Sequence, residues 1–310
     1  MNMFESPIVE YSGVISNCKL FIKRDDLIPF SFGGNKYRIA AELFKDMISK
    51  GCNCIIGYGN TRSNMCRVIA NMASSKGYPC YIVNPVLEDD PSEKTCNSSI
   101  VNLCSARIRK CSPSNVAETV EAVMNECRNE GFTPYYINGD KYGHGNEKVQ
   151  LRAYSKAYLE ICEQAKELGL FFDYIFLPTG TGMTQGGLVA GKKLAKGKER
   201  IVGISVARDS IKETEIIYNM LEAFFDNPIT RNGDVIVDDS FLCGGYGRYD
   251  ESVIKIIQQM QVNYGLPLDP TYSGKAFTGM LAYVKDHDIK GNVLYVHTGG
   301  TPLFFDYLKN

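Results

Sequence analysis

Short apolar runs alternate with longer amphipathic segments along most of this chain. Six runs rich in β-branched and aromatic residues are predicted to be strands, at 52–57, 78–83, 134–137, 174–177, 201–206 and 293–296. Apolar residues recur at helical spacing between them, most clearly at 64–75, 115–130, 147–168, 184–195 and 252–264. Strands and helices that alternate in this way predict an α/β fold of parallel sheets with helices on both faces. Ligands bind such sheets beyond the carboxyl ends of the strands.

Two features bear on how the chain divides into domains. A polar, glycine-containing run at 138–146 separates an early set of strand and helix units from a later set. A further strand is predicted at 18–23, and we expect it to join the sheet formed by the later set. The length of 310 residues is sufficient for about two domains.

Composition and charge narrow the classes of partner. Apolar residues make up 44% of the chain and charged residues 22%, as in ordinary globular enzymes. The 34 basic and 35 acidic residues nearly cancel, so the chain has no electrostatic footprint for nucleic acid or an anionic membrane. No apolar run approaches the length of a membrane span, and residues 1–7 lack the basic start of a secretory leader. We therefore expect a cytoplasmic protein that binds a small molecule.

The cysteines favour a reducing environment. They number 11, an odd count, and they are scattered among apolar neighbours, which favours buried thiols over disulfides. Cys52 and Cys54 have no second cysteine pair to complete a metal site, and the three histidines form no zinc motif. We expect no metal site.

Lys36 is the first candidate for chemistry. It follows a flexible segment at 31–35 that contains Gly33 and Gly34, and it opens an amphipathic helix that Gly51 ends. The positive end of a helix disfavours a protonated amine, so a lysine in the first turn has a lowered pKa and is a better nucleophile for an aldehyde. A solvated surface lysine is the alternative interpretation.

Three loops follow predicted strands and carry polar groups. The loop 178–187 runs from a strand into a helix, so its glycines and free backbone N–H groups are suited to a phosphate. A dinucleotide site is the main rival, but Gln185 stands where that fingerprint has its third glycine. In the loop 57–64, Ser63 is a predicted helix N-cap, and the N–H groups behind it could hold a carboxylate. The loop 295–300 contains His297 and Thr298, which by themselves indicate a core histidine and a turn hydroxyl.

Taken together, these segments resemble a known family, the pyridoxal-phosphate enzymes of the tryptophan-synthase β fold (fold type II). Within it, the chain is similar to the group of D-cysteine desulfhydrases and 1-aminocyclopropane-1-carboxylate deaminases. The matching stretches are FIKRDDLIPFSFGGNKYR, SNMCR at 63–67, LPTGTGMTQGGL, LDPTYSGKA at 268–276 and VLYVHTGG at 293–300. The resemblance implies two three-layer domains with parallel sheets: a larger cofactor-binding domain of 1–45 and 147–310, and a smaller inserted α/β domain of 46–146. It also implies a homodimer.

The resemblance further implies a role for each matching residue. Lys36 would bind the aldehyde of pyridoxal 5'-phosphate covalently and then serve as the base at the α-carbon, while Asn64 would bind the ring 3-hydroxyl and Thr298 the ring nitrogen. The phosphate would be bound by Gly180, Thr181, Gly182, Met183 and Thr184. The substrate carboxylate would be bound by Ser63, Asn64 and Met65. Ser63, Tyr272 and Tyr295 would contact the reacting part of the substrate. Because Thr298 is neutral, the ring is a weaker electron sink, which favours loss of a β-substituent over a long-lived carbanion.

The predicted activity is therefore a lyase that eliminates the β-substituent of a small amino acid, with D-cysteine giving pyruvate, ammonia and hydrogen sulfide as the default. Met65 replaces the histidine usual in this group, and the loop 138–146 lacks its Gly-Gly-Ser-Asn pattern. Ring opening by a deaminase, which Tyr295 favours and Thr298 disfavours, and β-replacement by a biosynthetic synthase are the alternatives. A protein that binds the cofactor without turnover is a further hypothesis.

Overall fold

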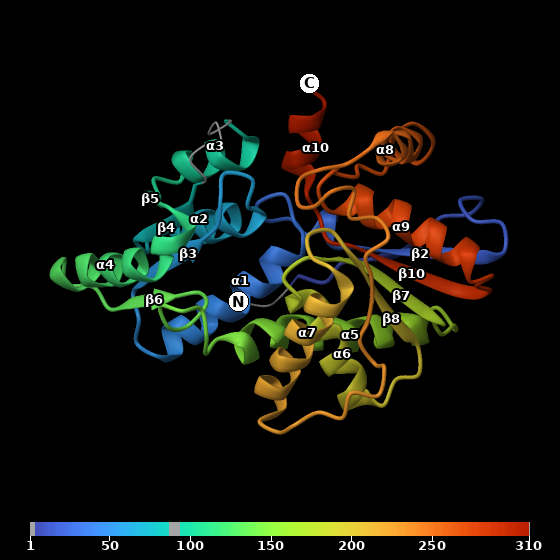
Figure 1. Cartoon of the computed structure of the whole chain (residues 1–310), viewed down its shortest axis with the longest axis horizontal. Helices are drawn as coiled ribbons and strands as arrows, with labels where there is room; N and C mark the ends of the chain where they lie inside the picture. Colours follow the sequence, from blue (N-terminus) through green and yellow to red (C-terminus); the bar gives the residue numbers. More distant parts are fainter. Residues whose placement is uncertain (1–3, 87–93, 310) are drawn as a thin grey trace. The chain divides into compact units, whose positions relative to one another are not determined.

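The computed structural model describes residues 4–86 and 94–309, and the chain divides into two compact units. The smaller unit comprises Lys36–Gln150, and the larger unit joins the segment that ends at Asn35 to Leu151–Leu308. Each unit is built on its own β-sheet with helices packed against it (Figure 1). The sequence placed the domain boundaries at 45/46 and 146/147, and the structure changes units at 35/36 and 150/151.

The larger unit contains a six-stranded sheet with the strand order β1-β2-β10-β7-β8-β9. The strands are β1 (Ile8–Glu10), β2 (Cys18–Arg24), β7 (Tyr174–Thr179), β8 (Arg200–Ser205), β9 (Ile236–Asp238) and β10 (Gly291–His297). All neighbours are parallel except the pair β1 and β2. Because β2 pairs with β10 along its whole length, the prediction that the N-terminal strand joins the later sheet is confirmed.

Helices cover both faces of this sheet, with α8 and α9 on one face and α5, α6 and α7 on the other (Figure 1). The helices of the unit are the 3-10 helix η1 (Asp25–Leu27) and α5 (Glu147–Glu167), α6 (Met183–Ala195), α7 (Ser210–Phe225), α8 (Glu251–Tyr264), α9 (Ser273–Asp286) and α10 (Thr301–Tyr307). Alternate strand residues such as Ile22, Phe176 and Tyr295 pack with Val253 of α8 and Phe277 of α9 in the main hydrophobic core. The period of two along each strand leaves a second apolar set for the opposite face.

The smaller unit contains a four-stranded parallel sheet with the order β5-β4-β3-β6. Its elements are α1 (Asn35–Ser49), β3 (Cys54–Tyr58), α2 (Asn64–Lys76), β4 (Cys80–Pro85), α3 (Cys96–Leu103), β5 (Arg107–Cys111), the 3-10 helix η2 (Pro113–Asn115), α4 (Val116–Asn129) and β6 (Pro134–Tyr136). Helix α1 groups with this sheet. The ring of Phe44 lies 6.3 Å from that of Tyr78, and the Tyr135 hydroxyl donates to Asp46 at 2.7 Å.

The α/β fold class predicted from the sequence is confirmed, and each predicted strand and helix is present with its ends within two residues of the predicted positions. Strand β5 was missed because its side chains are largely basic and half-exposed. Arg107 and Arg109 of this strand lie over the ring of Tyr81, at 5.2 and 5.6 Å from its centroid. The aliphatic parts of the two arginine side chains cover the face of this ring, whereas a hydropathy pattern assigns arginine to solvent.

Within residues 4–86 and 94–309, no helix has the length and apolar character needed to cross a membrane. The same residues contain no group of three or more histidine, cysteine or acidic side chains that could hold a metal ion. The cysteines of this part of the chain form no disulfides.

Gly187 of α6 packs against α5 so closely that no side chain fits. A Cβ there would lie 2.5 Å from the Cβ of Tyr154 and 2.7 Å from the carbonyl oxygen of Leu151. The adjacent Gly186 is a matched control, because a Cβ there would meet nothing closer than 3.4 Å. We predict that Gly187→Ala lowers the free energy of unfolding by about 2–3 kcal/mol, whereas Gly186→Ala changes it by less than about 1 kcal/mol. Urea denaturation checks both variants, and equal effects would contradict this packing.

Candidate active site

The segment before α1 follows a strained backbone path. Ser31, Phe32, Gly33 and Gly34 all have positive φ angles, of 48°, 59°, 64° and 94°. Non-glycine residues adopt this conformation infrequently, so the surrounding structure must hold it. One restraint is the N–H of Gly34, which donates to the carbonyl of Asp25 at 2.7 Å.

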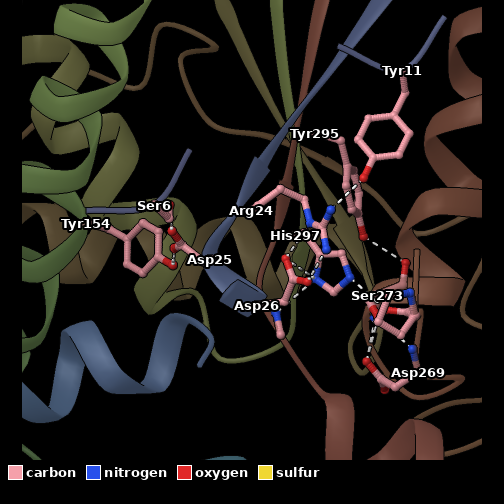
Figure 2. Close-up of polar contacts among 12 residues, drawn as sticks. Ser6, Tyr11, Arg24, Asp25, Asp26, Tyr154, Asp269, Ser273, Tyr295 and His297 are labelled. Atoms are coloured by element: carbon pink, nitrogen blue, oxygen red, sulfur yellow. Dashed lines mark hydrogen bonds and ion pairs between the residues drawn. The ribbon is translucent and has the colours of Figure 1, made fainter. Parts of the chain in front are cut away.

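The Asp25 side chain anchors the same segment. Its carboxylate is fully buried and accepts hydrogen bonds from the Ser6 hydroxyl, at 2.6 Å, and from the Tyr154 hydroxyl (Figure 2). A buried carboxylate without such donors would be strongly destabilising, so these partners fix the position of Asp25. The N-terminal segment, η1 and α5 are thereby joined where the segment before α1 begins.

Lys36 is the second residue of α1 and lies in its first turn, as the sequence predicted. Desolvation by its surroundings lowers its pKa to about 8. Near neutral pH a larger fraction of Lys36 side chains therefore carries a neutral amine than for an ordinary lysine. The lowered pKa agrees with the prediction, and its cause in the structure is desolvation of the amine.

Asn35, the residue before Lys36, connects two other candidate segments. Its backbone N–H donates to the carbonyl of Thr298 at 3.0 Å, and its side-chain Nδ2 donates to the hydroxyl of Thr184 at 2.9 Å. The packing is close, because a Cβ on Gly34 would lie 2.6 Å from the Thr298 carbonyl oxygen. The larger unit therefore brings together the segment before Lys36, the candidate phosphate loop and the loop after β10.

The candidate phosphate loop ends at the N-terminus of α6, where the chain turns through Gly182 with a φ of 77°. Within the described residues no side chain caps this helix, so its first N–H groups have no side-chain partner. A Cβ on Gly182 would lie 2.8 Å from Cγ1 of Ile217, which requires glycine here. Thr181 is exposed, and its hydroxyl makes no hydrogen bond to the part of the chain that the structure describes. An uncapped helix N-terminus beside a free hydroxyl is suited to a phosphate.

Arg208 and Glu213 brace this loop, although the sequence did not assign them to the site. Arg208 donates to the carbonyl of Gly180 and pairs with Glu213 at 2.9 Å. Glu213 is fully buried, and its other oxygen accepts from the Thr179 hydroxyl at 3.2 Å. Because the Gly180 carbonyl is engaged by Arg208, the N–H groups of the loop remain available for an anion. No sequence motif signals this brace, because Glu213 belongs to a separate helix, α7.

His297 is a satisfied core histidine at the end of β10 (Figure 2). Its Nε2 lies 2.8 Å from the carbonyl of Pro267, and its Nδ1 accepts from the N–H of Gly299 at 3.1 Å. These partners assign the donor role to Nε2 and the acceptor role to Nδ1. The nearest acid is Asp26, 3.8 Å from Nδ1, and its carboxylate is already bound by two nitrogens of Arg24 at 2.9 and 2.8 Å. His297 thus holds the glycine turn that follows it.

Thr298 lies between this histidine and that turn. Its side chain is 7% exposed, and in residues 4–86 and 94–309 its hydroxyl has no hydrogen-bond partner. A largely buried hydroxyl normally finds a partner, so this one is available to an external polar atom.

At the start of α2, Ser63 is the N-cap that the sequence predicted. Its hydroxyl oxygen accepts from the N–H of Cys66 at 3.2 Å. Met65 is 8% exposed, so its thioether is packed into the smaller unit. The simple helix-cap interpretation of Ser63 is therefore correct, and the N–H groups of the first turn remain beside it.

Asn64 is oriented by a buried polar network within the smaller unit. Its Oδ1 accepts from Nδ2 of Asn97, at 3.0 Å, and from the guanidinium of Arg67, at 3.3 Å. Arg67 also donates to Oδ1 of Asn97 at 2.8 Å, and burial lowers the pKa of Arg67 to about 10. With its oxygen engaged, Asn64 presents Nδ2, which bonds to none of the described residues. Asn97 was missed because α3 meets α2 only in the folded chain.

The two candidate tyrosines differ in accessibility. Tyr272 is half-buried, and its hydroxyl lies 2.7 Å from that of Tyr246. Tyr295 is fully buried, its ring packs on Phe277, and its hydroxyl donates to the carbonyl of Ser273 at 2.7 Å (Figure 2). Desolvation raises the pKa of Tyr295 well above its ordinary value. A direct role for Tyr295 in a reaction would require this hydrogen bond to break.

Asp269 links Tyr272 to the loop after β10. Its Oδ1 accepts from the N–H of Tyr272 at 2.8 Å, and a Cβ on Gly300 would lie 2.3 Å from its Oδ2. Desolvation raises the pKa of this buried carboxyl. The candidate phosphate loop, Thr298 and Tyr272 therefore belong to one continuous set of contacts in the larger unit, whereas Ser63, Asn64 and Met65 belong to the smaller unit.

Residues 2–299 match the family of pyridoxal-phosphate dependent enzymes, and the chain belongs to that family. A protein of Pyrococcus abyssi provisionally named 1-aminocyclopropane-1-carboxylate deaminase is 31% identical over 294 residues, which cover 93% of this chain and 86% of the relative. The D-cysteine desulfhydrase of Serratia proteamaculans is 27% identical over 296 residues, which cover 93% of this chain and 88% of the relative.

Solved structures agree with this assignment. The crystal structure of a homologue of 1-aminocyclopropane-1-carboxylate deaminase has a TM-score of 0.85 at 27% identity, and the match covers 99% of this chain and 92% of the homologue. O-ureido-L-serine synthase shares the fold, with a TM-score of 0.67 at 15% identity. The match covers 97% of this chain and 92% of the synthase. The protein is thus a fold type II enzyme that uses pyridoxal phosphate, of the deaminase and desulfhydrase type.

The residues present fit this cofactor. The uncapped N-terminus of α6 suits its phosphate, and the partnerless hydroxyl of Thr298 suits a ring nitrogen. Nδ2 of Asn64 is a donor for a ring oxygen, and Lys36 has the lowered pKa that an aldehyde requires.

The network around Asn64 yields a prediction on stability. We expect Asn97→Ala to lower the free energy of unfolding by about 1–3 kcal/mol, because it leaves the buried Arg67 and Asn64 without a shared partner. Asn102→Ala is the matched control, since Asn102 is an exposed residue of the same helix and gains the same helix propensity. Urea denaturation of the cofactor-free protein measures both. A loss no greater in Asn97→Ala than in the control would contradict the network.

Proposed function

We propose that this enzyme is a lyase that eliminates the β-substituent of a small amino acid, with D-cysteine giving pyruvate, ammonia and hydrogen sulfide as the default reaction. The observation that carries the proposal is Lys36, whose pKa of about 8 leaves an amine able to bond an aldehyde and to take up a proton. The desulfhydrase of Serratia proteamaculans supports the choice of substrate.

The cofactor would be held by residues of several segments. Lys36 would bind its aldehyde group, Asn64 the ring 3-oxygen and Thr298 the ring nitrogen. The phosphate would be held by the backbone and hydroxyl groups of Gly180, Thr181, Gly182, Met183 and Thr184. When bound, pyridoxal phosphate supplies an electron sink that stabilises negative charge at the α-carbon of the substrate.

The chain's own groups then bind the substrate and move protons. Neutral Nζ of Lys36 takes the α-proton, because a buried amine of lowered pKa is a base near neutral pH. Ser63 and the first N–H groups of α2, at Asn64 and Met65, hold the substrate carboxylate at the positive end of that helix. Tyr272 donates a proton to the leaving group. The neutral Thr298 hydroxyl favours departure of that group over accumulation of charge in the ring.

Deamination of 1-aminocyclopropane-1-carboxylate is the second candidate, because the relative in Pyrococcus abyssi is provisionally named for that reaction. Ring opening with Tyr295 as proton donor would require its hydroxyl to leave the Ser273 carbonyl. A β-replacement synthase is the third candidate, in which an added nucleophile takes the place of the leaving group.

We further propose a cytoplasmic homodimer. The cytoplasmic location is supported by cysteines that form no disulfides among the described residues, as in reducing compartments. The homodimer rests on the resemblance to the family.

The first prediction from this function concerns cofactor attachment. Borohydride reduction after incubation with pyridoxal phosphate is expected to leave a pyridoxyl label on Lys36 alone. Because only the neutral amine reacts, the initial rate of labelling should rise about tenfold for each pH unit below the pKa and level off above it, and that pKa is about 8. Peptide mapping measures both.

Lys45→Ala is the control for this labelling, since Lys45 is an exposed lysine of the same helix. The Lys45→Ala protein should label normally, and the Lys36→Ala protein should not label. A label on any other lysine, or none in the wild type, would refute the assignment.

The second prediction concerns products. With D-cysteine alone, we expect pyruvate, ammonia and sulfide in equal amounts, and addition of a thiol or amine nucleophile should not divert the product. Lys36→Ala should lower turnover by at least about 10³-fold, because the base and the covalent attachment are both lost. Formation of 2-oxobutyrate from 1-aminocyclopropane-1-carboxylate, without sulfide from D-cysteine, would establish the deaminase instead. Capture of the nucleophile would establish the synthase.

A further inference from the structure

Two cysteine thiols lie in direct contact inside the smaller unit. The Sγ atoms of Cys54 and Cys127 are 3.2 Å apart, and both side chains are fully buried. A thiol is a weak donor and a weak acceptor, so one sulfur shares a proton with the other. The two residues are 73 positions apart in the sequence, and no candidate role in cofactor or substrate binding involves either of them.

The periods of a strand and a helix bring the two thiols together. Cys54 is the first residue of β3, and successive side chains of a strand point to opposite faces of the sheet. A Cβ on Gly57 would lie 3.5 Å from Cγ2 of Ile69 in α2, so Cys54, three residues before Gly57, faces the other side. Cys127 is one of the buried residues of α4, which packs against β3 (Figure 1).

The hydrogen bond makes the two thiols unequal. Donation from Cys54 lowers the pKa of Cys127, and this effect outweighs the desolvation of Cys127. The same hydrogen bond, together with burial, raises the pKa of Cys54. Cys127 is therefore the thiol that more readily becomes a thiolate, which is the form that reacts with oxidants.

Charged side chains at the surface cover Cys127. Arg107 of β5 and Glu126 and Glu130 near the end of α4 all act electrostatically on its thiol, and all three are partly exposed. Nη1 of Arg107 lies 2.5 Å from the carboxylate of Glu130 and 3.9 Å from that of Glu126. Ion pairs of this kind contribute little to stability, so they part without much cost. A molecule as small as a hydroperoxide can then reach the thiol.

We propose that Cys54 and Cys127 form a dithiol pair that a hydroperoxide converts reversibly to a disulfide. An S–S bond is about 2.05 Å long, so the two sulfur atoms need to approach by only about 1 Å from their distance of 3.2 Å. This chemistry is independent of the substrate proposed above.

The oxidation proceeds in two steps. The thiolate of Cys127 attacks one oxygen of hydrogen peroxide, the O–O bond breaks, and the sulfur becomes a sulfenic acid. The hydroxide that leaves takes up the proton that Cys127 had released. Sγ of Cys54 then attacks the sulfenic sulfur, the S–O bond breaks, and the Cys54 proton leaves with the hydroxyl group as water. Two thiols are thus oxidised to one disulfide, and hydrogen peroxide is reduced to two molecules of water.

The test exposes the folded holoenzyme to hydrogen peroxide and maps its peptides without reduction. We expect one cross-linked pair of peptides that joins Cys54 to Cys127, lighter by two hydrogen atoms than the two thiol peptides together. Dithiothreitol should restore both thiols. The oxidised protein should also have a Tm higher by about 5 °C, because the disulfide closes a loop of 73 residues in the unfolded chain.

Three variants test the assignment of this pair. Cys54→Ala and Cys127→Ala should each form no cross-link and lose the rise in Tm. Cys80→Ala is the matched control, because Cys80 is a buried thiol of the neighbouring strand β4, and it should behave as the wild type. Each protein is compared with its own reduced form, so a variant of lower basal stability still gives a clear result.

Exposed Cys162 reports whether the peroxide treatment was sufficient. If Cys162 is oxidised while Cys54 and Cys127 remain thiols, the pair is not redox-active and the proposal is overturned. It is also overturned if Cys127 is converted to a sulfinic or sulfonic acid without a cross-link, or if Cys54 cross-links to a different cysteine.

Discussion

The candidate active site depends above all on the way the chain is held just before Lys36. Asn35 donates its backbone N–H to the Thr298 carbonyl and its side-chain N–H to the Thr184 hydroxyl, so two segments from different parts of the sequence meet at the residue that precedes Lys36. Four consecutive residues with positive φ lead into this point, and the buried carboxylate of Asp25 anchors them. Without these restraints the strained segment would relax, and Asn35 would no longer be held against Thr184 and Thr298.

The same unit shows how buried polar groups can form a rigid site in a largely apolar protein. Glu213, His297 and Lys275 are all fully buried, and each is satisfied by named partners: Arg208 for the glutamate, backbone groups for the histidine, and three carbonyls for the lysine. Each holds a loop that would otherwise be flexible. The groups left without partners, such as the Thr298 hydroxyl, are then the ones available to a ligand.

Much of the fold was readable from the sequence because strand and helix periodicity depend on local residues. The central strands and the amphipathic helices were predicted within two residues, and so was the first-turn position of Lys36. The residues that orient the site were not readable in this way. Asn97, Glu213 and Tyr246 lie far in sequence from the groups that they contact, and hydropathy does not distinguish a buried, satisfied polar side chain from an exposed one.

The sequence by itself determined the α/β class, the order of the loops with candidate functional residues, and the resemblance that indicated pyridoxal phosphate. It could do so because strand and helix periodicity and short motifs are local properties of the chain. Only the tertiary structure decided which partners the polar side chains have and that desolvation lowers the pKa of Lys36. Tyr295 and Tyr272 are the same residue type in the sequence. In the structure the Tyr295 hydroxyl donates to the buried carbonyl of Ser273, whereas the Tyr272 hydroxyl lies beside that of Tyr246. Hydrogen-bond partners and desolvation are set by contacts between distant segments, so they exist only once the chain has folded.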